Sequence, residues 1–258
     1  MESIFAAGAL EALAASDALL AFDFDGTLAP IVADPALATM RPATRHLLAQ
    51  AAQLYPCAVI SGRPEEDVLR LLGGVTVWYV IGNRALQPPD EVARLSSQVG
   101  GWHARLDSAL SGLSGVRIED KGVSLAIHYR NAKEHEVAVA AIRDAAAGLS
   151  QARLIAGKDV INLLPLGGPN KGVALARVRA QLGCASALYV GDDRTDEDVF
   201  ALPHLVSVRV GAAADSAARF HLRDQEEVDD LLERLVALRP RRMPRQEAMW
   251  RPAPRRME

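Results

Sequence analysis

Cysteine is scarce in this sequence of 258 residues. Only Cys57 and Cys184 occur, and both lie in apolar runs. Two such thiols supply neither a disulfide framework nor the ligand set of a zinc site. We therefore interpret both as buried, reduced thiols and expect the protein to be cytoplasmic.

The sequence also lacks long apolar runs and an excess of charge of one sign. No apolar run is long enough to cross a membrane, and the N-terminus has no basic segment of the kind found in signal peptides. The formal net charge of −3 gives no indication of a nucleic-acid partner. We expect a monomer or weak dimer whose partner is a small molecule rather than a membrane or a nucleic acid.

The composition that remains is that of a globular protein. Half of the residues are hydrophobic, which is enough for a sizeable core, and the length predicts one large domain or two modest ones. From residue 19 to residue 81, apolar strand-like runs alternate with helical patterns in the order β-α-β-α-β. This alternation predicts a parallel sheet with helices on both faces.

The pattern changes after Pro88-Pro89, which we interpret as a linker. Residues 90–164 follow the order α-β-β-α-β-β, in which each pair of strands is joined by a short turn that contains Gly and Lys. We predict an α/β fold with a Rossmann-like core at residues 1–86 and 167–239 and an inserted α+β cap at residues 87–166. Residues 240–258 contain six Arg and four Pro, and we expect a disordered basic tail.

Residues 19–28 form an apolar run that ends in two carboxylates, Asp23 and Asp25, followed by Gly26 and Thr27. Side chains at i and i+2 of an ideal strand share a face, and the carboxyl end of a parallel strand borders the crevice where such sheets bind ligands. Two buried like charges need compensation, and Mg²⁺ prefers carboxylate oxygens. The alternative is a strand that ends in an ordinary polar turn, because Asp-Gly is a common turn pair.

Three further segments have a similar form. Ser61 follows an apolar strand, Lys171 begins a helical pattern, and the doublet Asp192-Asp193 follows the apolar run at residues 187–190. A lysine at a helix start suits an anion, although most such lysines are simply solvated. An acidic helix start explains the later acids at residues 196–198, but it does not explain a doublet directly after a buried strand.

These four strand ends resemble the haloacid dehalogenase superfamily of phosphotransferases in residue type and in chain order. The matching motifs are DFDGT at 23–27, Ser61, Lys171 and GDDRTD at 191–196. The resemblance implies that Asp23 is the nucleophile that forms an aspartyl-phosphate and that Asp25 is the acid and base. It also implies that Ser61 and Lys171 bind phosphoryl oxygens.

The same resemblance implies a Mg²⁺ cofactor. Its ligands would come from Asp23, from the backbone carbonyl of Asp25 and from Asp192. Asp193 and Asp196 would orient water bound to the metal.

The cap pattern resembles the sugar-phosphatase branch with a type-IIB cap, and the trehalose-6-phosphate phosphatases match best. The matching pieces are DFDGTLAPI at 23–31, SGRP at 61–64, the run at 119–130, Gly157-Lys158, the segment at 170–172 and GDDRTDED at 191–198. This family implies hydrolysis of trehalose 6-phosphate to trehalose and phosphate. We predict substrate contacts from Arg63, Glu119, Lys121, Arg130, Lys158 and Asn162, each of which could instead be an exposed charge or amide.

The chain departs from the family pattern at two places. It has Gly82-Asn83-Arg84 where the family commonly has Glu-His-Gly. It also has Asn162 where the family has an acidic residue. The missing carboxylate leaves open a phosphatase for another sugar phosphate, such as a glucosyl- or mannosyl-phosphoglycerate. A further alternative is a non-enzymatic sugar-phosphate sensor, which would lack the nucleophile or the acid, whereas Asp23 and Asp25 are both present.

Overall fold

The computed structural model describes residues 1–6, 8–82, 89–157, 159–168 and 170–239. The described chain divides into two compact units. The first contains Met1–Gly82 and the chain from Lys171 onward, and the second contains the segment between them. The predicted basic tail at residues 240–258 lies outside the described residues.

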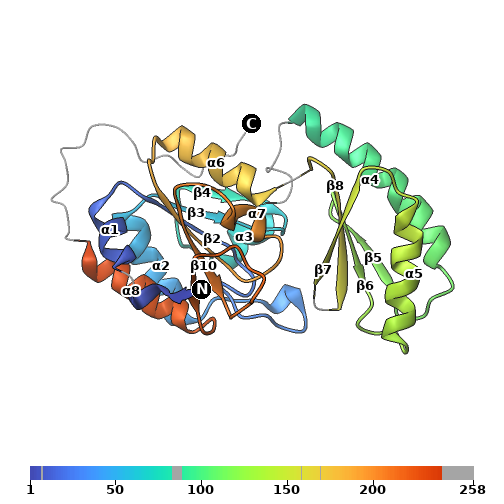
Figure 1. Cartoon of the computed structure of the whole chain (residues 1–258), viewed down its shortest axis with the longest axis horizontal. Coiled ribbons are helices and arrows are strands. Elements are labelled where there is room, and N and C mark those ends of the chain that lie inside the picture. The colour runs from blue at the N-terminus through green and yellow to red at the C-terminus, as the bar shows by residue number, and fades with distance from the viewer. Residues whose placement is uncertain (7, 83–88, 158, 169, 240–258) are drawn as a thin grey trace. The chain divides into compact units, whose positions relative to one another are not determined.

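The first unit is built on a parallel sheet of seven strands (Figure 1). Along the sheet the order is β1-β11-β10-β9-β2-β3-β4, and each neighbouring pair runs parallel. The strands are β1 Glu2–Ser3, β2 Leu19–Phe22, β3 Cys57–Ile60, β4 Tyr79–Ile81, β9 Ala187–Gly191, β10 Leu205–Val210 and β11 Phe220–Leu222. The central strands β2, β3 and β9 are buried along their whole length, which explains their continuous apolar sequences.

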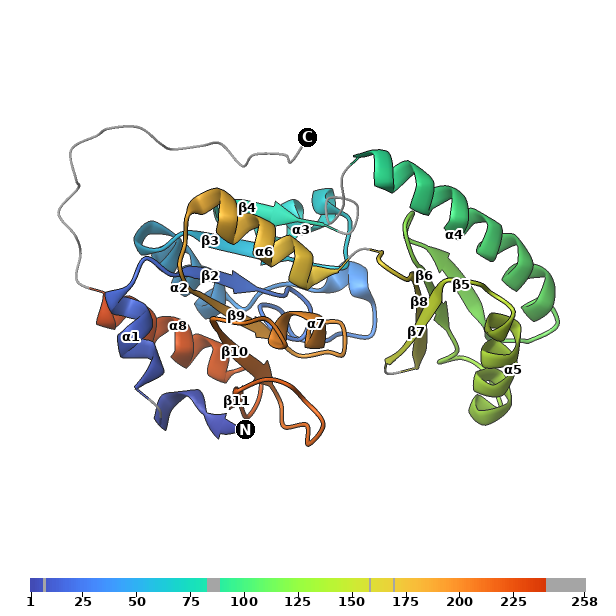
Figure 2. The same cartoon turned by 45° about the horizontal axis from the view of Figure 1, so that its top comes forward.

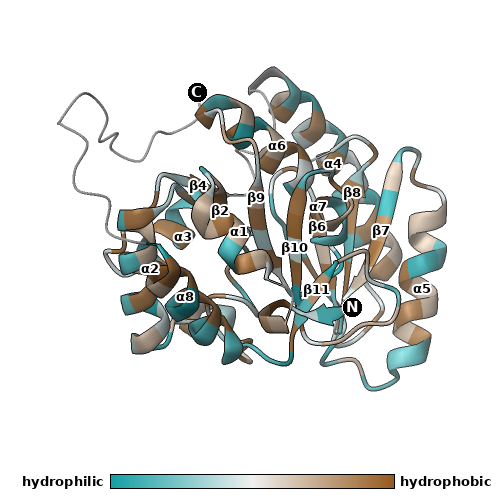
Figure 3. Ribbon diagram, turned by 60° about the vertical axis from the view of Figure 1, so that its left-hand side comes forward, coloured by the Kyte–Doolittle hydropathy of each residue, from teal (hydrophilic) through white to brown (hydrophobic). Residues whose placement is uncertain are grey.

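Helices cover both faces of this sheet (Figures 1 and 2). They are α1 Ala9–Ala15, α2 Pro42–Leu54, α3 Glu65–Leu71, α6 Lys171–Leu182, α7 Glu197–Phe200 and α8 Glu227–Leu238, with 3-10 turns at Ile4–Ala6 and Pro35–Leu37. Apolar side chains of α1, α2 and α8 join one large core with the sheet, whereas α6 covers the opposite face. Figure 3 shows this as brown strands and as helices whose apolar and polar sides differ in colour.

The second unit is an antiparallel sheet backed by two long helices. Its elements are α4 Pro89–Leu110, β5 Arg117–Asp120, β6 Leu125–His128, α5 His135–Ala147, β7 Ala152–Gly157 and β8 Val160–Pro165, with strand order β5-β6-β8-β7. One face of the sheet presents Leu125, Ile127, Ile161 and Leu163, which pack with apolar residues of α4 and α5. The predicted α/β core with an inserted α-β-β-α-β-β segment is confirmed.

The edge strand β1 and its neighbour β11 do not follow from the sequence pattern. β1 has two residues and β11 has three, and the two pair in parallel at the edge of the sheet. So short a run shows no periodicity that distinguishes a strand from a loop. Within the part of the chain that the structure describes, no helix is long and apolar enough to cross a membrane.

Candidate active site

The predicted site residues of the first unit gather at the carboxyl ends of β2 and β9. These strands are parallel neighbours, with Phe22 opposite Val190. Asp23 directly follows β2, and its N–H donates to Val190 O at 2.9 Å. Asp192 directly follows β9. The register of the two strands therefore brings both carboxylates to the same edge of the sheet.

Lys171 lies between two of the carboxylates. Its Nζ is 2.9 Å from Asp23 Oδ2 and 2.8 Å from Asp196 Oδ1, and all three side chains are at least nine-tenths buried. A cation at the first residue of a helix is disfavoured by the helix dipole. Burial also opposes the charge, but Asp196 and Asp23 outweigh both effects and hold the pKa of Lys171 well above its usual range.

Asp196 is fixed by three donors although it is completely buried. Oδ1 accepts hydrogen bonds from Lys171 Nζ and from the Tyr189 hydroxyl at 2.7 Å, and Oδ2 accepts the N–H of Asp193 at 3.0 Å. The carboxylate folds back against Gly191, where a Cβ would lie 2.3 Å from Asp196 Cγ. Only glycine at this position allows so close an approach.

Asp192 presents the unsatisfied oxygen of the site. Among the described residues no donor reaches its buried Oδ1. Burial first, and then the charges of Asp193 and Asp196, raise the pKa of Asp192 to about 7. Gly26, at φ +77°, lies so close to this carboxylate that a Cβ would be 2.0 Å from Asp192 Oδ2.

These features fit a divalent cation. Asp23, Asp192 and Asp196 each place a carboxylate oxygen within 4.8 Å of the others. Three carboxylates and the Lys171 ammonium carry a formal charge of −2, which a divalent ion would neutralise. Burial, together with the charges of Asp196 and Asp192, raises the pKa of Asp23 well above its usual range despite the opposing charge of Lys171. Because three donors already occupy three of the roughly four acceptor positions of the Asp196 carboxylate, Asp192 and Asp23 are the better ligands.

Asp25 points to a different partner from Asp23. β2 ends at Phe22, so strand alternation does not set the directions of the two side chains. Both carboxylate oxygens of Asp25 accept from Arg63, with Nε–Oδ2 and Nη2–Oδ1 distances of 2.6 Å. Arg63 was predicted to contact the substrate. In the structure its guanidinium is instead hydrogen-bonded to Asp25, the predicted acid and base. The buried Ser61, which follows β3, accepts the N–H of Arg63 through Oγ at 3.2 Å.

Asp193 lies in a tight turn at the edge of the cluster. Its Oδ1 accepts from the N–H and from the hydroxyl of Thr195, at 2.7 and 2.6 Å. The side chain therefore stabilises the turn, and it is the backbone N–H of Asp193 that contacts Asp196.

In the second unit, Glu119 and Asn162 occupy one row of the antiparallel sheet. Glu119 pairs with Ala126 on β6, and Ala126 pairs with Asn162 on β8. Paired residues point to the same side, which is opposite the side that packs on α4 and α5. Glu119 Oε2 lies 2.7 Å from His128 Nε2, and this hydrogen bond lowers the pKa of Glu119. The structure thus places these two predicted substrate residues on the same face of the sheet, with Ala126 of β6 between them.

The structure describes two of the other predicted cap residues, Lys121 and Arg130. Lys121 belongs to the β5–β6 turn, where its N–H donates to Ser124 O at 3.0 Å. Arg130 Nε lies 3.5 Å from Asp159 Oδ2. Lys158 lies outside the described residues.

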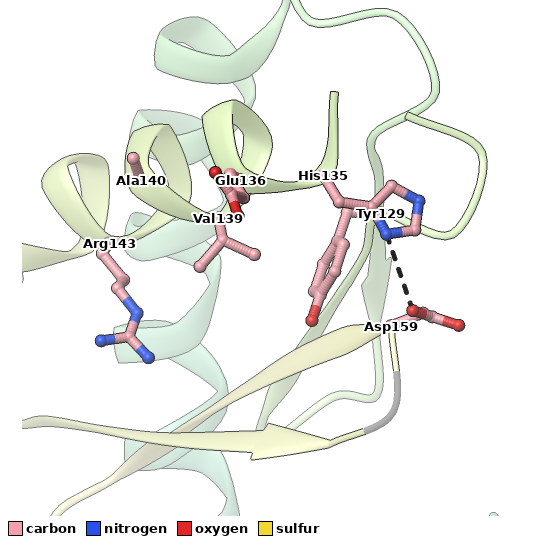
Figure 4. Close-up of a pocket in the computed structure, with 7 residues that line it drawn as sticks. All are labelled: Tyr129, His135, Glu136, Val139, Ala140, Arg143 and Asp159. Carbon is pink, nitrogen blue, oxygen red and sulfur yellow. Dashed lines mark ion pairs between the residues drawn. The ribbon is translucent and has the colours of Figure 1, made fainter. Parts of the chain in front are cut away.

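Beside the Arg130–Asp159 ion pair, residues of α5 together with Tyr129 and Asp159 border a hollow of about 450 Å³ (Figure 4). His135 Nδ1 points to Asp159 Oδ1 at 3.8 Å, and the His135 ring meets Tyr129 edge to face. His135 and Asp159 face each other, whereas Arg143 is exposed and lies apart from this pair. The hollow therefore shows no arrangement directed at a ligand.

Sequence reasoning missed Tyr189, which lies inside the apolar strand β9. Its ring is completely buried and its hydroxyl contacts Asp196. A tyrosine in an otherwise aliphatic buried strand is a usable signal, because a buried phenol needs a hydrogen-bond partner.

The sequence matches the family described as Trehalose-phosphatase over residues 21–84 and 102–218. The chain belongs to this family. It is 30% identical to the probable trehalose-phosphate phosphatase 9 of Oryza sativa subsp. japonica, over 90% of this chain and 74% of the relative. It is 34% identical to the trehalose-phosphate phosphatase of Mycobacterium tuberculosis over 88% of this chain, and it spans 65% of that relative's length. The predicted resemblance to this family is confirmed.

The fold agrees with solved structures. The C-terminal domain of the Candida albicans trehalose-6-phosphate phosphatase superposes with a TM-score of 0.77 at 22% identity, over 92% of this chain and 98% of that one. At this level of identity the comparison concerns the fold, and it confirms the predicted fold class.

Proposed function

We propose that this trehalose-phosphatase family member is a Mg²⁺-dependent phosphatase that hydrolyses trehalose 6-phosphate to trehalose and phosphate. The observation that carries the proposal is the buried Asp23–Lys171–Asp196 bridge beside the unpaired oxygen of Asp192. A nucleophilic carboxylate, an ammonium for phosphoryl oxygens and a vacant carboxylate oxygen are the parts that phosphoryl transfer requires. We place the enzyme in the cytoplasm, with Cys57 and Cys184 as buried free thiols.

In the proposed reaction, a carboxylate oxygen of Asp23 attacks phosphorus as the bond from phosphorus to the sugar oxygen breaks. Water then attacks the aspartyl-phosphate, which releases phosphate and restores the Asp23 carboxylate. Lys171 and the Ser61 hydroxyl hold non-bridging phosphoryl oxygens through both steps. The buried position of Lys171 strengthens this interaction, because few water molecules compete for the ammonium.

Asp25 gives a proton to the leaving sugar oxygen and later takes one from the attacking water. Its carboxylate is side-on to Arg63, which holds both oxygens and so fixes the plane of the carboxyl group. To donate a proton, Asp25 has to release at least one of these two hydrogen bonds. Arg63 is then free to interact with the phosphoryl group of the substrate, which is consistent with its predicted contact.

Asp23 and Asp192 are the residues that would hold Mg²⁺, together with the backbone carbonyl of Asp25. Bound there, the ion supplies positive charge that offsets the developing charge on the phosphoryl group. Asp196 and the N–H of Asp193 would stabilise the site without binding the ion, because the Asp196 carboxylate already accepts three hydrogen bonds.

We propose that the sugar is recognised by the row that contains Glu119 and Asn162, with Lys121, Arg130 and Lys158 as further polar groups of the cap. A carboxylate and an amide on one sheet face, on either side of Ala126, suit sugar hydroxyls, which both donate and accept. The rice and mycobacterial relatives, both named trehalose-phosphate phosphatases, support trehalose 6-phosphate as the substrate.

A phosphate-release panel tests the proposal. Purified protein with Mg²⁺ is assayed on trehalose 6-phosphate, sucrose 6-phosphate, glucose 6-phosphate, a glucosyl-phosphoglycerate and p-nitrophenyl phosphate, with Asp23→Asn as the matched background control. We expect kcat/KM for trehalose 6-phosphate to exceed the others by at least about 100-fold. Preference for the phosphoglycerate glycoside would overturn the substrate, and release from none of them would favour a sugar-phosphate sensor.

A further inference from the structure

Tyr189 is a buried polar side chain that no step of the proposed reaction uses. It lies in the middle of β9 with no exposed surface, and its hydroxyl donates to Asp196 Oδ1 at 2.7 Å. Its ring meets Phe200 at 6.0 Å between centroids, edge to face, which fixes the direction of the hydroxyl. The hydrogen bond is therefore made by a rigid donor on a central strand.

The acceptor is the oxygen that also holds Lys171. Lys171 Nζ lies 2.8 Å from Asp196 Oδ1 and 2.9 Å from Asp23 Oδ2. A carboxylate oxygen has two lone-pair directions, and the hydroxyl of Tyr189 occupies one of them. The Lys171 ammonium occupies the other lone-pair direction, and from there it also contacts Asp23.

We propose that Tyr189 is a positioning residue for phosphoryl transfer, which acts through Asp196 to keep the Lys171 ammonium against Asp23. This inference rests on the proposed phosphatase function. Without the hydroxyl, Asp196 Oδ1 loses a rigid donor and offers Lys171 a second direction of approach. The ammonium then spends less time where it meets both the nucleophile and the phosphoryl oxygens.

The test compares Tyr189→Phe with Tyr55→Phe. Tyr55 is a matched control in the same unit, because it is 2% exposed and its hydroxyl donates to Leu235 O at 2.8 Å, remote from the carboxylate cluster. Each variant loses one oxygen and one buried hydrogen bond, so we expect similar falls in melting temperature. We expect kcat of Tyr189→Phe on trehalose 6-phosphate to fall about 10-fold with KM changed less than about threefold, and Tyr55→Phe to keep the wild-type kcat.

Two further measurements separate positioning from general damage. Calorimetric titration with Mg²⁺ alone should give Tyr189→Phe an affinity within about twofold of the wild type, because the hydroxyl acts on Lys171 and not on Asp192. With 4-aminophenylalanine at position 189, which restores a donor on the ring, most of the lost kcat should return. This variant also keeps the test decisive if Tyr189→Phe is insoluble.

A kcat of Tyr189→Phe equal to that of Tyr55→Phe would overturn the inference, as would a tenfold loss of Mg²⁺ affinity without a change in kcat at saturating metal. Absence of rescue by the amino analogue in a folded protein would also count against it. These outcomes all presuppose an active wild type. If the wild type releases no phosphate from any substrate of the panel, the proposed function fails first and separately.

Discussion

Gly26 offers the sharpest test of how the backbone shapes this site. It has φ +77°, and a Cβ built on it would lie 2.0 Å from Asp192 Oδ2 and 2.3 Å from Asp192 Cγ. Ordinary contacts begin near 3.4 Å, so Gly26→Ala has to displace the Asp192 carboxylate or the loop by roughly 1.4 Å. An error of about 1 Å in a catalytic arrangement can cost on the order of 10²-fold in rate.

Gly211 supplies the matched control. It has φ +79°, and a Cβ there would meet nothing within 4 Å. Both substitutions carry the left-handed backbone cost of about 1–2 kcal/mol, which appears as lower stability. Only Gly26→Ala carries the clash with Asp192, and any difference in activity between the two variants therefore measures that clash.

The assay is phosphate release from trehalose 6-phosphate over a Mg²⁺ titration, with a thermal melt of each variant. We expect Gly26→Ala to lose about 100-fold in kcat/KM and to need more Mg²⁺ for half-maximal rate, and Gly211→Ala to remain within about threefold of wild type. If Gly26→Ala matches Gly211→Ala in both readouts, the close packing of Gly26 on Asp192 does not matter for the reaction.

The other predictions follow from single groups of the site and the cap. Asp23→Asn should lower turnover by on the order of 10³-fold or more while the protein still folds, and retention of a tenth of the activity would exclude the covalent route. Asp25→Asn should lose less on p-nitrophenyl phosphate than on trehalose 6-phosphate, because nitrophenolate leaves without an acid; equal losses would remove Asp25 from that role. Glu119→Ala should lower kcat/KM for trehalose 6-phosphate by roughly 10- to 200-fold and spare p-nitrophenyl phosphate, a contrast that damage to the catalytic core could not produce; equal losses on both substrates would remove Glu119 from sugar recognition. Removal of metal with a chelator should abolish phosphate release, and Mg²⁺ at 100 times its Kd should stabilise the protein by about 2.7 kcal/mol in a thermal or denaturant melt; no shift would contradict the metal site.

The sequence identifies the reactive carboxylates because acidic residues are unusual directly after a buried strand. Carboxylates directly after an apolar strand, as at Asp23 and Asp192, stand out against the solvent-exposed positions that acids normally take. Alternation of strands and helices then predicts a parallel sheet, and a parallel sheet brings strand ends to one edge. Asp23, Lys171 and Asp192 are therefore expected at one edge of the sheet from the sequence alone, without any knowledge of distances.

The sequence does not reveal which side chains of the site form hydrogen bonds or ion pairs with one another. That Asp25 pairs with Arg63 depends on where β2 ends and on how the loops after β2 and β3 turn, and neither follows from periodicity. Strand alternation gives Asp23 and Asp25 the same direction, but both residues lie beyond the last residue of the strand. The short strands β1 and β11 cannot be predicted for the related reason that two or three residues show no periodicity.

Burying this carboxylate cluster is energetically unfavourable, which explains why the residues that donate hydrogen bonds to it look like ordinary core residues in the sequence. Two buried acids, Asp23 and Asp196, and the partly buried Asp192 repel one another, and each needs a hydrogen-bond donor or a cation to compensate its charge. Donors of that kind have to be buried and rigid, as a strand tyrosine at position 189 or a backbone N–H at position 193 is. The space that the Asp192 and Asp196 carboxylates need is made by the absence of a side chain at Gly26 and Gly191. A buried phenol and glycines at or near strand ends are common in α/β proteins, so the role of these residues can be recognised only once the acids that they contact are known.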